Sequence, residues 1–266
     1  MLWIVQENLW REPEYRKFLD IISRSGVNYR TIKVIPFSHE LEPKIEYEGR
    51  RIAYGSTTLM RIAQAERWNP GCYFNNKFDF RYWKEAYGQH LLNNDAIVCK
   101  FKDVLVDAPE IFIRPCADLK QFTGRIIKHD EFEEWRENTL KMDSVSSLTG
   151  ETKVSYASKK TIYNEHRFFV VGRKVVTGSI YRLCNEFVGG SKGAHLSVEP
   201  QARDFAQAMV DLWSPHDVFV IDIASTDVGY KVVEINCANA AGFYNSDVSK
   251  LVQAIHSYEG VNSVPA

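Results

Sequence analysis

The sequence predicts an α+β protein in which a small α/β domain precedes two α+β lobes. The chain opens with apolar patterns in the order strand, helix, strand, which is typical of a small parallel sheet. Further along, two pairs of apolar runs are each joined by a short turn, and such pairs indicate antiparallel hairpins. We expect domains at residues 1–94, 95–157 and 158–266, because residues 93–95 form a polar break and the first hairpin opens the last domain.

Length and composition describe an ordinary globular protein. With 266 residues the chain can bury an ample core. Its net charge of -1 gives no electrostatic case for a nucleic-acid or membrane partner. No apolar run approaches about 18 residues, and the stretch MLWIVQENLW lacks the basic region and cleavage site of a signal peptide. The cysteines are scattered without a CxxC pattern, so we expect reduced thiols and a cytoplasmic location.

The first domain is expected to alternate strands and helices. Its expected elements are strands at 2–5, 29–35 and 52–54 and helices at 12–25, 57–67 and 79–87. Thr57 or Thr58 is the expected N-cap of the second helix. The turn at residues 55–58 is either a phosphate or substrate contact at a helix N-terminus or a plain strand-to-helix turn. The sequence leaves both interpretations open.

The second domain is expected to hold strands around a polar loop. Its expected elements are strands at 96–100, 110–115 and 125–127, a helix at 131–140 and a loop at 143–152. Asp130 is the expected N-cap of the helix. The loop CADLKQFTG carries Asp118, Lys120 and Gly124 between two of the strands. Such a loop can fold over a polyphosphate, because lysine supplies a mobile positive charge and glycine lets the backbone approach closely.

Charged residues interrupt the first hairpin of the last domain, whose strands are expected at 165–171 and 175–183. Glu165 and Arg167 share a face of their strand, and Arg182 lies near the end of the partner strand. Charged side chains in strands usually face solvent. The alternative is that these three converge on one site, where two arginines would suit a triphosphate or an acyl phosphate.

A glycine-rich stretch, two helices and a second hairpin complete the last domain. Residues 187–195 (FVGGSKGAH) form either a phosphate-binding loop or a flexible surface linker. Helical spacing of apolar residues predicts helices at 199–213 and 247–258. Between these helices, apolar runs at 218–223 and 230–236 predict the strands of the second hairpin.

The second hairpin carries oxygen-bearing side chains inside otherwise apolar strands. Glu234 and Asn236 are two residues apart and therefore point to the same face, and antiparallel pairing can bring Asp222 opposite them. Acidic residues at strand ends are often simply solvated, but burying two carboxylates without a cation is costly. Two carboxylates and an amide form the oxygen ligand set that Mg²⁺ prefers when nucleotide phosphates complete its octahedron.

The order of these motifs resembles the ATP-grasp superfamily, and most closely its compact RimK-like members and small phage and bacterial proteins with an FIRP…K.FTG signature. The motifs that carry the resemblance are EIFIRP with its lysine loop, EHRFFVV, VFVIDIA and VVEINCAN. They cover residues 96–250, and the D…E-x-N element is the most specific. EHR, with Glu165 and Arg167, matches the acidic-x-Arg of the RimK-like hairpin.

This resemblance implies an ATP-grasp fold, in which two α+β lobes clasp a nucleotide behind a small pre-ATP-grasp domain. It implies Mg²⁺, or Mn²⁺ as an alternative, held by Asp222, Glu234 and Asn236. Such enzymes transfer the γ-phosphate of ATP to a carboxylate, and an amine then attacks the acyl phosphate to form an amide or peptide bond. The expected partners are ATP and small-molecule or peptide substrates, with Arg167 and Arg182 as catalytic residues and no nucleic acid or membrane.

The sequence departs from the family at the phosphate-binding lysine on the strand, where Arg114 stands instead. We expect Lys120 to take over the catalytic role of that lysine, with Arg114 as an accessory phosphate ligand. Lys100 is another candidate nucleotide contact. Val154 and Ser155 fall where the backbone of the family reads adenine, and Glu165, Asp222 and Glu234 are further expected contacts to the nucleotide.

Other functions remain open at this point. Asp222 with Glu234 and Asn236 superficially resembles the D…E-x-K site of a metal-dependent nuclease, but asparagine replaces the lysine that would help to activate water. A non-catalytic nucleotide-binding module could keep the fold. A phosphotransferase that stops after phosphorylating its substrate would have the same site. The ligase is the interpretation that the sequence favours.

Overall fold

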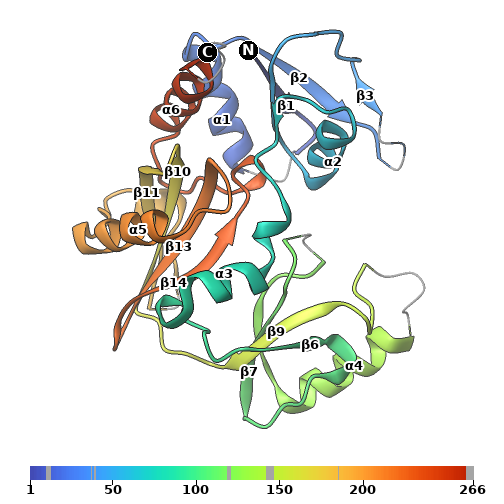
Figure 1. The fold of residues 1–266 in the computed structure, drawn as a ribbon, viewed down its shortest axis with the longest axis vertical. Helices are drawn as coiled ribbons and strands as arrows, with labels where there is room; N and C mark the ends of the chain where they lie inside the picture. Colours follow the sequence, from blue (N-terminus) through green and yellow to red (C-terminus); the bar gives the residue numbers. More distant parts are fainter. Residues whose placement is uncertain are drawn as a thin grey trace.

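The computed structural model describes residues 1–9, 13–36, 38, 40–118, 121–141, 147–184 and 186–261. These residues form three sheets with helices packed on them, and the predicted α+β fold class is confirmed. We call them the N-terminal, second and third sheets in chain order. Figure 1 shows the third sheet between the N-terminal sheet, which lies beside both ends of the chain, and the second sheet.

The N-terminal sheet is built around β1 (Leu2–Gln6), whose LWIVQ sequence is buried along its whole length. β1 pairs in parallel with β2 on one side and β4 on the other, and a parallel strand is normally buried on both faces. The elements of this domain are β2 (Tyr29–Val34), β3 (Leu41–Glu42), β4 (Arg51–Tyr54), β5 (Pro70–Gly71), α1 (Pro13–Arg24) and α2 (Thr57–Ala65). The predicted strand–helix–strand opening is confirmed.

The second sheet is antiparallel, with the strand order β6-β9-β7-β8. Its elements are β6 (Ile97–Lys100), β7 (Glu110–Pro115), β8 (Arg125–Lys128), β9 (Lys153–Ser158) and α4 (His129–Lys141). Phe101, Ile113 and Phe132 are fully buried in the core that this sheet shares with α4. The sheet therefore has a hydrophobic core of its own.

The third sheet is antiparallel, with the strand order β12-β11-β10-β13-β14. Its elements are β10 (Asn164–Val171), β11 (Lys174–Leu183), β12 (Glu186–Phe187), β13 (Val218–Thr226), β14 (Gly229–Asn236), α3 (Phe80–Tyr87), α5 (Pro200–Leu212) and α6 (Val248–Val261). Both predicted hairpins are confirmed. Short 3-10 helices lie at Asn76–Phe78, Gly88–His90, Phe101–Asp103, Gly190–Gly193 and Ala238–Ala240.

The faces of the third sheet are covered by different helices. Phe168 and Ile221 belong to the core that α3 and α5 build on one face. Phe169 and Val220 belong to the core that α1 and α6 build on the other. Since side chains alternate along a strand, residue 222 lies on the same face as Val220. This second face is thus apolar under α6 and becomes polar further along β10 and β13.

The predicted helix caps need correction. The cap of α2 is Ser56 and not Thr57 or Thr58, because the Ser56 side chain accepts a hydrogen bond from the Leu59 amide. The helix α4 begins at His129, so Asp130 lies within its first turn and does not precede it. In both cases the helix starts one or two residues earlier than its apolar pattern indicates.

The sheets fall within the predicted domains, except that Ser158 extends β9 one residue past the expected boundary. The division into three domains stays a prediction, because α3, from the first range, packs against the third sheet. Residues 142–146, most of which belong to the predicted loop, lie outside the described residues. No helix in the described part of the chain has the length and apolarity needed to cross a membrane.

Replacing Ser56 with alanine tests the cap of α2. The Ser56 hydroxyl also donates to Gln6 Oε1, at 2.7 Å. Loss of an N-cap side chain costs about 1 kcal/mol, so Ser56→Ala should lower the free energy of unfolding by about that amount in urea denaturation. Thr58→Ala is the matched control and should be neutral or slightly stabilising, since alanine is the better helix former. Equal effects of the two substitutions would contradict Ser56 as the cap.

Candidate active site

A cavity of about 740 Å³ opens between the second and third sheets. Its walls come from the end of β7, the start of β8, the linker after β9, and the polar part of the third sheet. Arg114 lines it from the second sheet, whereas Arg167, Glu234 and Asn236 line it from the third. The cavity therefore gathers charged residues from strands that are far apart in the sequence.

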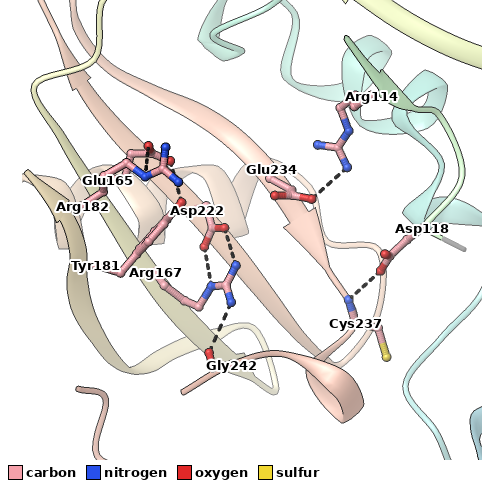
Figure 2. Close-up of polar contacts among 10 residues, drawn as sticks. All are labelled: Arg114, Asp118, Glu165, Arg167, Tyr181, Arg182, Asp222, Glu234, Cys237 and Gly242. Carbon is pink, nitrogen blue, oxygen red and sulfur yellow. Dashed lines mark hydrogen bonds and ion pairs between the residues drawn. The ribbon is translucent and has the colours of Figure 1, made fainter. Parts of the chain in front are cut away.

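The centre of the polar face is an ion pair between Arg167 and Asp222. Arg167 donates from Nε to Asp222 Oδ1 at 2.9 Å and from Nη2 to Oδ2 at 2.7 Å. Its third nitrogen donates to the Gly242 carbonyl at 3.3 Å (Figure 2). The guanidinium also lies over the rings of Tyr244 and Tyr181, with centroids at 4.8 Å and 5.4 Å. Arg167 is thus held by polar groups and aromatic faces together.

Burial and pairing act in opposite directions on this arginine. Burial by itself lowers the pKa of Arg167, but the charge and hydrogen bonds of Asp222 outweigh burial and hold that pKa well above its ordinary value. Asp222 is completely shielded from solvent. A buried charge is tolerated when an opposite charge with good hydrogen-bond geometry faces it. The pair is therefore a permanently ionised anchor beneath the cavity.

The structure brings the predicted metal ligands together. Asp222 pairs with Glu234, and Val220 with Asn236, so all three side chains lie on the same face of the β13–β14 hairpin. Arg114 reaches across the cavity and donates to Glu234 Oε1 at 2.9 Å. Its guanidinium lies over the fully buried Trp83 ring, 5.1 Å from the centroid. The role of the three oxygen-bearing residues as metal ligands stays a prediction.

The donor set fits a hard divalent cation. A carboxylate offers about four lone-pair sites, so Asp222 can accept from Arg167 and still face a cation. Glu234 keeps 31% of its side chain exposed to the cavity. Among the described residues, no group of three His, Cys, Asp or Glu side chains could hold a metal by itself. Two carboxylates and an amide suit Mg²⁺ that takes its other ligands from phosphates and water.

Glu165, Tyr181 and Arg182 form a second polar group beside the anchor. The Tyr181 hydroxyl donates to Glu165 Oε2 at 2.6 Å, and Arg182 Nε lies 3.3 Å from Oε1 (Figure 2). Burial raises the pKa of Glu165 above 4.5, and the hydrogen bond from Tyr181 and the charge of Arg182 offset part of that rise. Glu165 and Arg167 converge on the cavity, as one of the two alternatives from the sequence requires.

A protein-family comparison identifies the chain. A family model described as an ATP-grasp domain, the third family of its clade, matches residues 46–255. The chain belongs to this ATP-grasp family. The resemblance and the ATP-grasp fold predicted from the sequence are confirmed. No curated protein matches the chain.

Solved structures share the fold of this ATP-grasp protein at low sequence identity. The D-cycloserine synthetase DcsG has a TM-score of 0.61 and 10% identity, with 97% of this chain and 99% of that chain covered. A D-alanine–D-alanine ligase from Bacillus anthracis has a TM-score of 0.59 and 11% identity, with 98% and 97% covered. The ATP-grasp ligase PsnB, complexed with a minimal precursor, has a TM-score of 0.56 and 11% identity, with 97% and 98% covered.

Other predicted contacts of the ATP-grasp site do not line its cavity. Lys100 pairs with Glu151 at 2.7 Å. Val154 and Ser155 are buried in the second sheet, where β9 lies between β6 and β7. Lys120 lies outside the described residues. The nucleotide-binding roles of these four residues stay predictions.

The cavity also uses residues that the sequence did not single out. The linker at residues 159–162 lines it where the chain passes from the second to the third sheet. Tyr181 and Tyr244 stack on each other, with ring centroids 4.9 Å apart. Tyr244 has a φ of 50°, and a non-glycine residue in that region is uncommon and often lies at a functional site. An isolated tyrosine in a strand or loop gives no local sign of such a role.

The raised pKa of Glu165 gives the protein a pH-dependent term in its stability. The folded state binds this proton more tightly than the unfolded chain, so the contribution is complete below about pH 4.5 and is lost as the pH rises through the folded-state pKa. Glutamine cannot titrate. The unfolding free energy of Glu165→Gln relative to the native protein should therefore increase as the pH rises above 4.5, as measured by urea denaturation. A constant or decreasing difference would refute this assignment.

Proposed function

We propose that this ATP-grasp protein is an ATP-dependent ligase that joins a carboxylate to an amine through an acyl phosphate. The observation that carries the proposal is the convergence of Asp222, Glu234 and Asn236 on a cavity that Arg114 enters from the opposite sheet. The family supports ATP binding. Neighbours of the same fold that are described as ligases or synthetases support ligation.

The chemistry requires activation because a carboxylate would have to expel oxide. In the first step a carboxylate oxygen attacks the γ-phosphorus of ATP, which breaks the bond to ADP and forms an acyl phosphate. In the second step the amine attacks the acyl carbon, phosphate leaves, and the nitrogen loses a proton. Positioning and charge neutralisation account for most of the catalysis of phosphoryl transfer.

The residues of the cavity divide this work. Asp222, Glu234 and Asn236 would hold Mg²⁺, which supplies charge neutralisation when it is bound. Arg114 would bind a phosphate oxygen from the side of the second sheet. On the third sheet, Arg182 keeps 46% of its side chain exposed and is available to bind the substrate carboxylate or its phosphate. Arg167 is engaged with Asp222 and would act by keeping that carboxylate charged and oriented.

The expected substrates are amino acids, peptides or proteins. PsnB is described in complex with a precursor peptide, and another neighbour is a D-alanine–D-alanine ligase. This chain covers nearly the full length of both. The N-terminal domain and the loop at residues 187–195 are the parts we expect to select the acid and the amine.

Product analysis tests ligation directly. The protein should release ADP from Mg·ATP only when a suitable acid and amine are both present, and the joined product should weigh one water less than its two substrates together. Mass spectrometry with a panel of amino acids and peptides measures both. A phosphorylated acid without amine incorporation would indicate a phosphotransferase, and nucleic-acid cleavage independent of ATP would indicate a nuclease.

Substitution of the carboxylates tests the metal site. Glu234→Gln should abolish Mg·ATP turnover while circular dichroism remains native, because Glu234 is partly exposed. Asp222→Asn should also abolish turnover, but it leaves Arg167 buried without its counter-charge and should cost about 3–5 kcal/mol of stability. Asp227→Ala, in the exposed turn of the same hairpin, should turn over normally. Normal turnover by Glu234→Gln would rule out this metal site.

A further inference from the structure

The end of β7 and the residues after it contact the segment that carries the proposed magnesium ligands. Arg114 donates to Glu234 at 2.9 Å, and the Cys237 amide donates to Asp118 Oδ2 at 3.3 Å (Figure 2). Asn236 lies between Glu234 and Cys237 in the chain. The two contacts therefore bracket this predicted ligand, one on each side. We call Arg114, Asp118 and these two contacts the clasp.

The clasp is held firmly on the side of the second sheet. Between its two members, the Cys116 amide donates to the Lys153 carbonyl at 3.0 Å, and the Cys116 carbonyl accepts from the Phe80 amide at 2.8 Å. Cys116 and the Trp83 ring beneath Arg114 are buried. A functional side chain keeps its geometry when its supporting residues are themselves fixed. The backbone between Arg114 and Asp118 therefore provides a rigid support.

The Asp118 carboxylate is well suited to hold a backbone amide. It is 7% exposed, and a buried carboxylate needs hydrogen-bond donors to offset its desolvation. A hydrogen bond from an amide to a charged acceptor is about twice as strong as one between neutral groups. The end of β14 is also tied to the N-terminal domain, since Asn239 accepts from the Cys237 thiol at 3.2 Å and from the Tyr73 amide at 2.8 Å.

We propose that Asp118 is a positioning residue that fixes the end of β14 and thereby aims Glu234 and Asn236 into the cavity. Asp118 acts through the Cys237 amide, three residues beyond Glu234 and one beyond Asn236. Arg114 sets the direction of the Glu234 side chain, and Asp118 sets the path of the backbone that follows. The inference rests on the proposed magnesium site but not on ligation itself.

Two substitutions separate this role from a general structural one. Asp118→Ala removes the acceptor, whereas Asp118→Asn keeps an acceptor oxygen at the same place. Asp227→Ala, in the turn at the other end of the hairpin, controls for loss of a carboxylate. Hydrogen exchange of the Cys237 amide reports the contact. Calorimetric titration of the whole protein with ATP at increasing Mg²⁺ concentrations reports the site, without requiring turnover.

Asp118→Ala should accelerate exchange of the Cys237 amide and raise the Mg²⁺ concentration for half-maximal ATP binding, each by about 10-fold, the factor expected when a hydrogen bond to a charged group is lost. Asp118→Asn should recover most of both effects, and Asp227→Ala should match the native protein. Unchanged exchange in Asp118→Ala would overturn the contact. Faster exchange with unchanged Mg²⁺ dependence would overturn the positioning role.

The proposed ligase function can fail separately from this inference. If the native protein binds ATP with Mg²⁺ but joins no acid to an amine, ligation is refuted while the binding titrations still decide the role of Asp118. If the native protein shows no Mg²⁺-dependent ATP binding, the metal site and the positioning role are both refuted.

Discussion

The buried ion pair between Arg167 and Asp222 is the interaction on which the rest of the site depends. Each charge would be costly in the interior alone, and each offsets the desolvation of the other through two hydrogen bonds. The pair also specifies how β10 aligns with β13, because a shift of one residue would turn both charges onto the opposite, apolar face. Glu234 then takes its place because β14 pairs it with Asp222.

The same face of the third sheet serves two purposes along its length. Under α1 and α6 it carries Phe169 and Val220, which belong to a core shared with the N-terminal domain. Beyond that core the same rows of side chains continue as Arg167 and Asp222 and line or support the cavity. The packed helices thus hold the strands in place, while the uncovered end of the face remains available to a ligand. The second sheet closes this end through Arg114 and Asp118.

Much of the fold and the centre of the site could be predicted from the sequence. Strand alternation placed Glu234 and Asn236 on one face, and the apolar neighbours of Asp222 indicated that its carboxylate was not simply solvated. Helix starts were predicted less well, since Ser56 caps α2 by a side-chain contact that the apolar pattern does not encode. The sequence also could not reveal that Lys100 faces Glu151 and lies away from the cavity. Charge alone does not indicate which partner a surface lysine finds.

By itself, the sequence determined which side chains share a face and which chemistry they can support, because the period of a strand is local and needs no knowledge of the rest of the molecule. The tertiary structure alone decided which groups meet across the cavity. Arg114 and Glu234 are 120 residues apart, and Asp118 and Cys237 are 119 apart. Their meeting depends on how two separately folded sheets pack against each other, and that arrangement is set by contacts distributed over the whole chain.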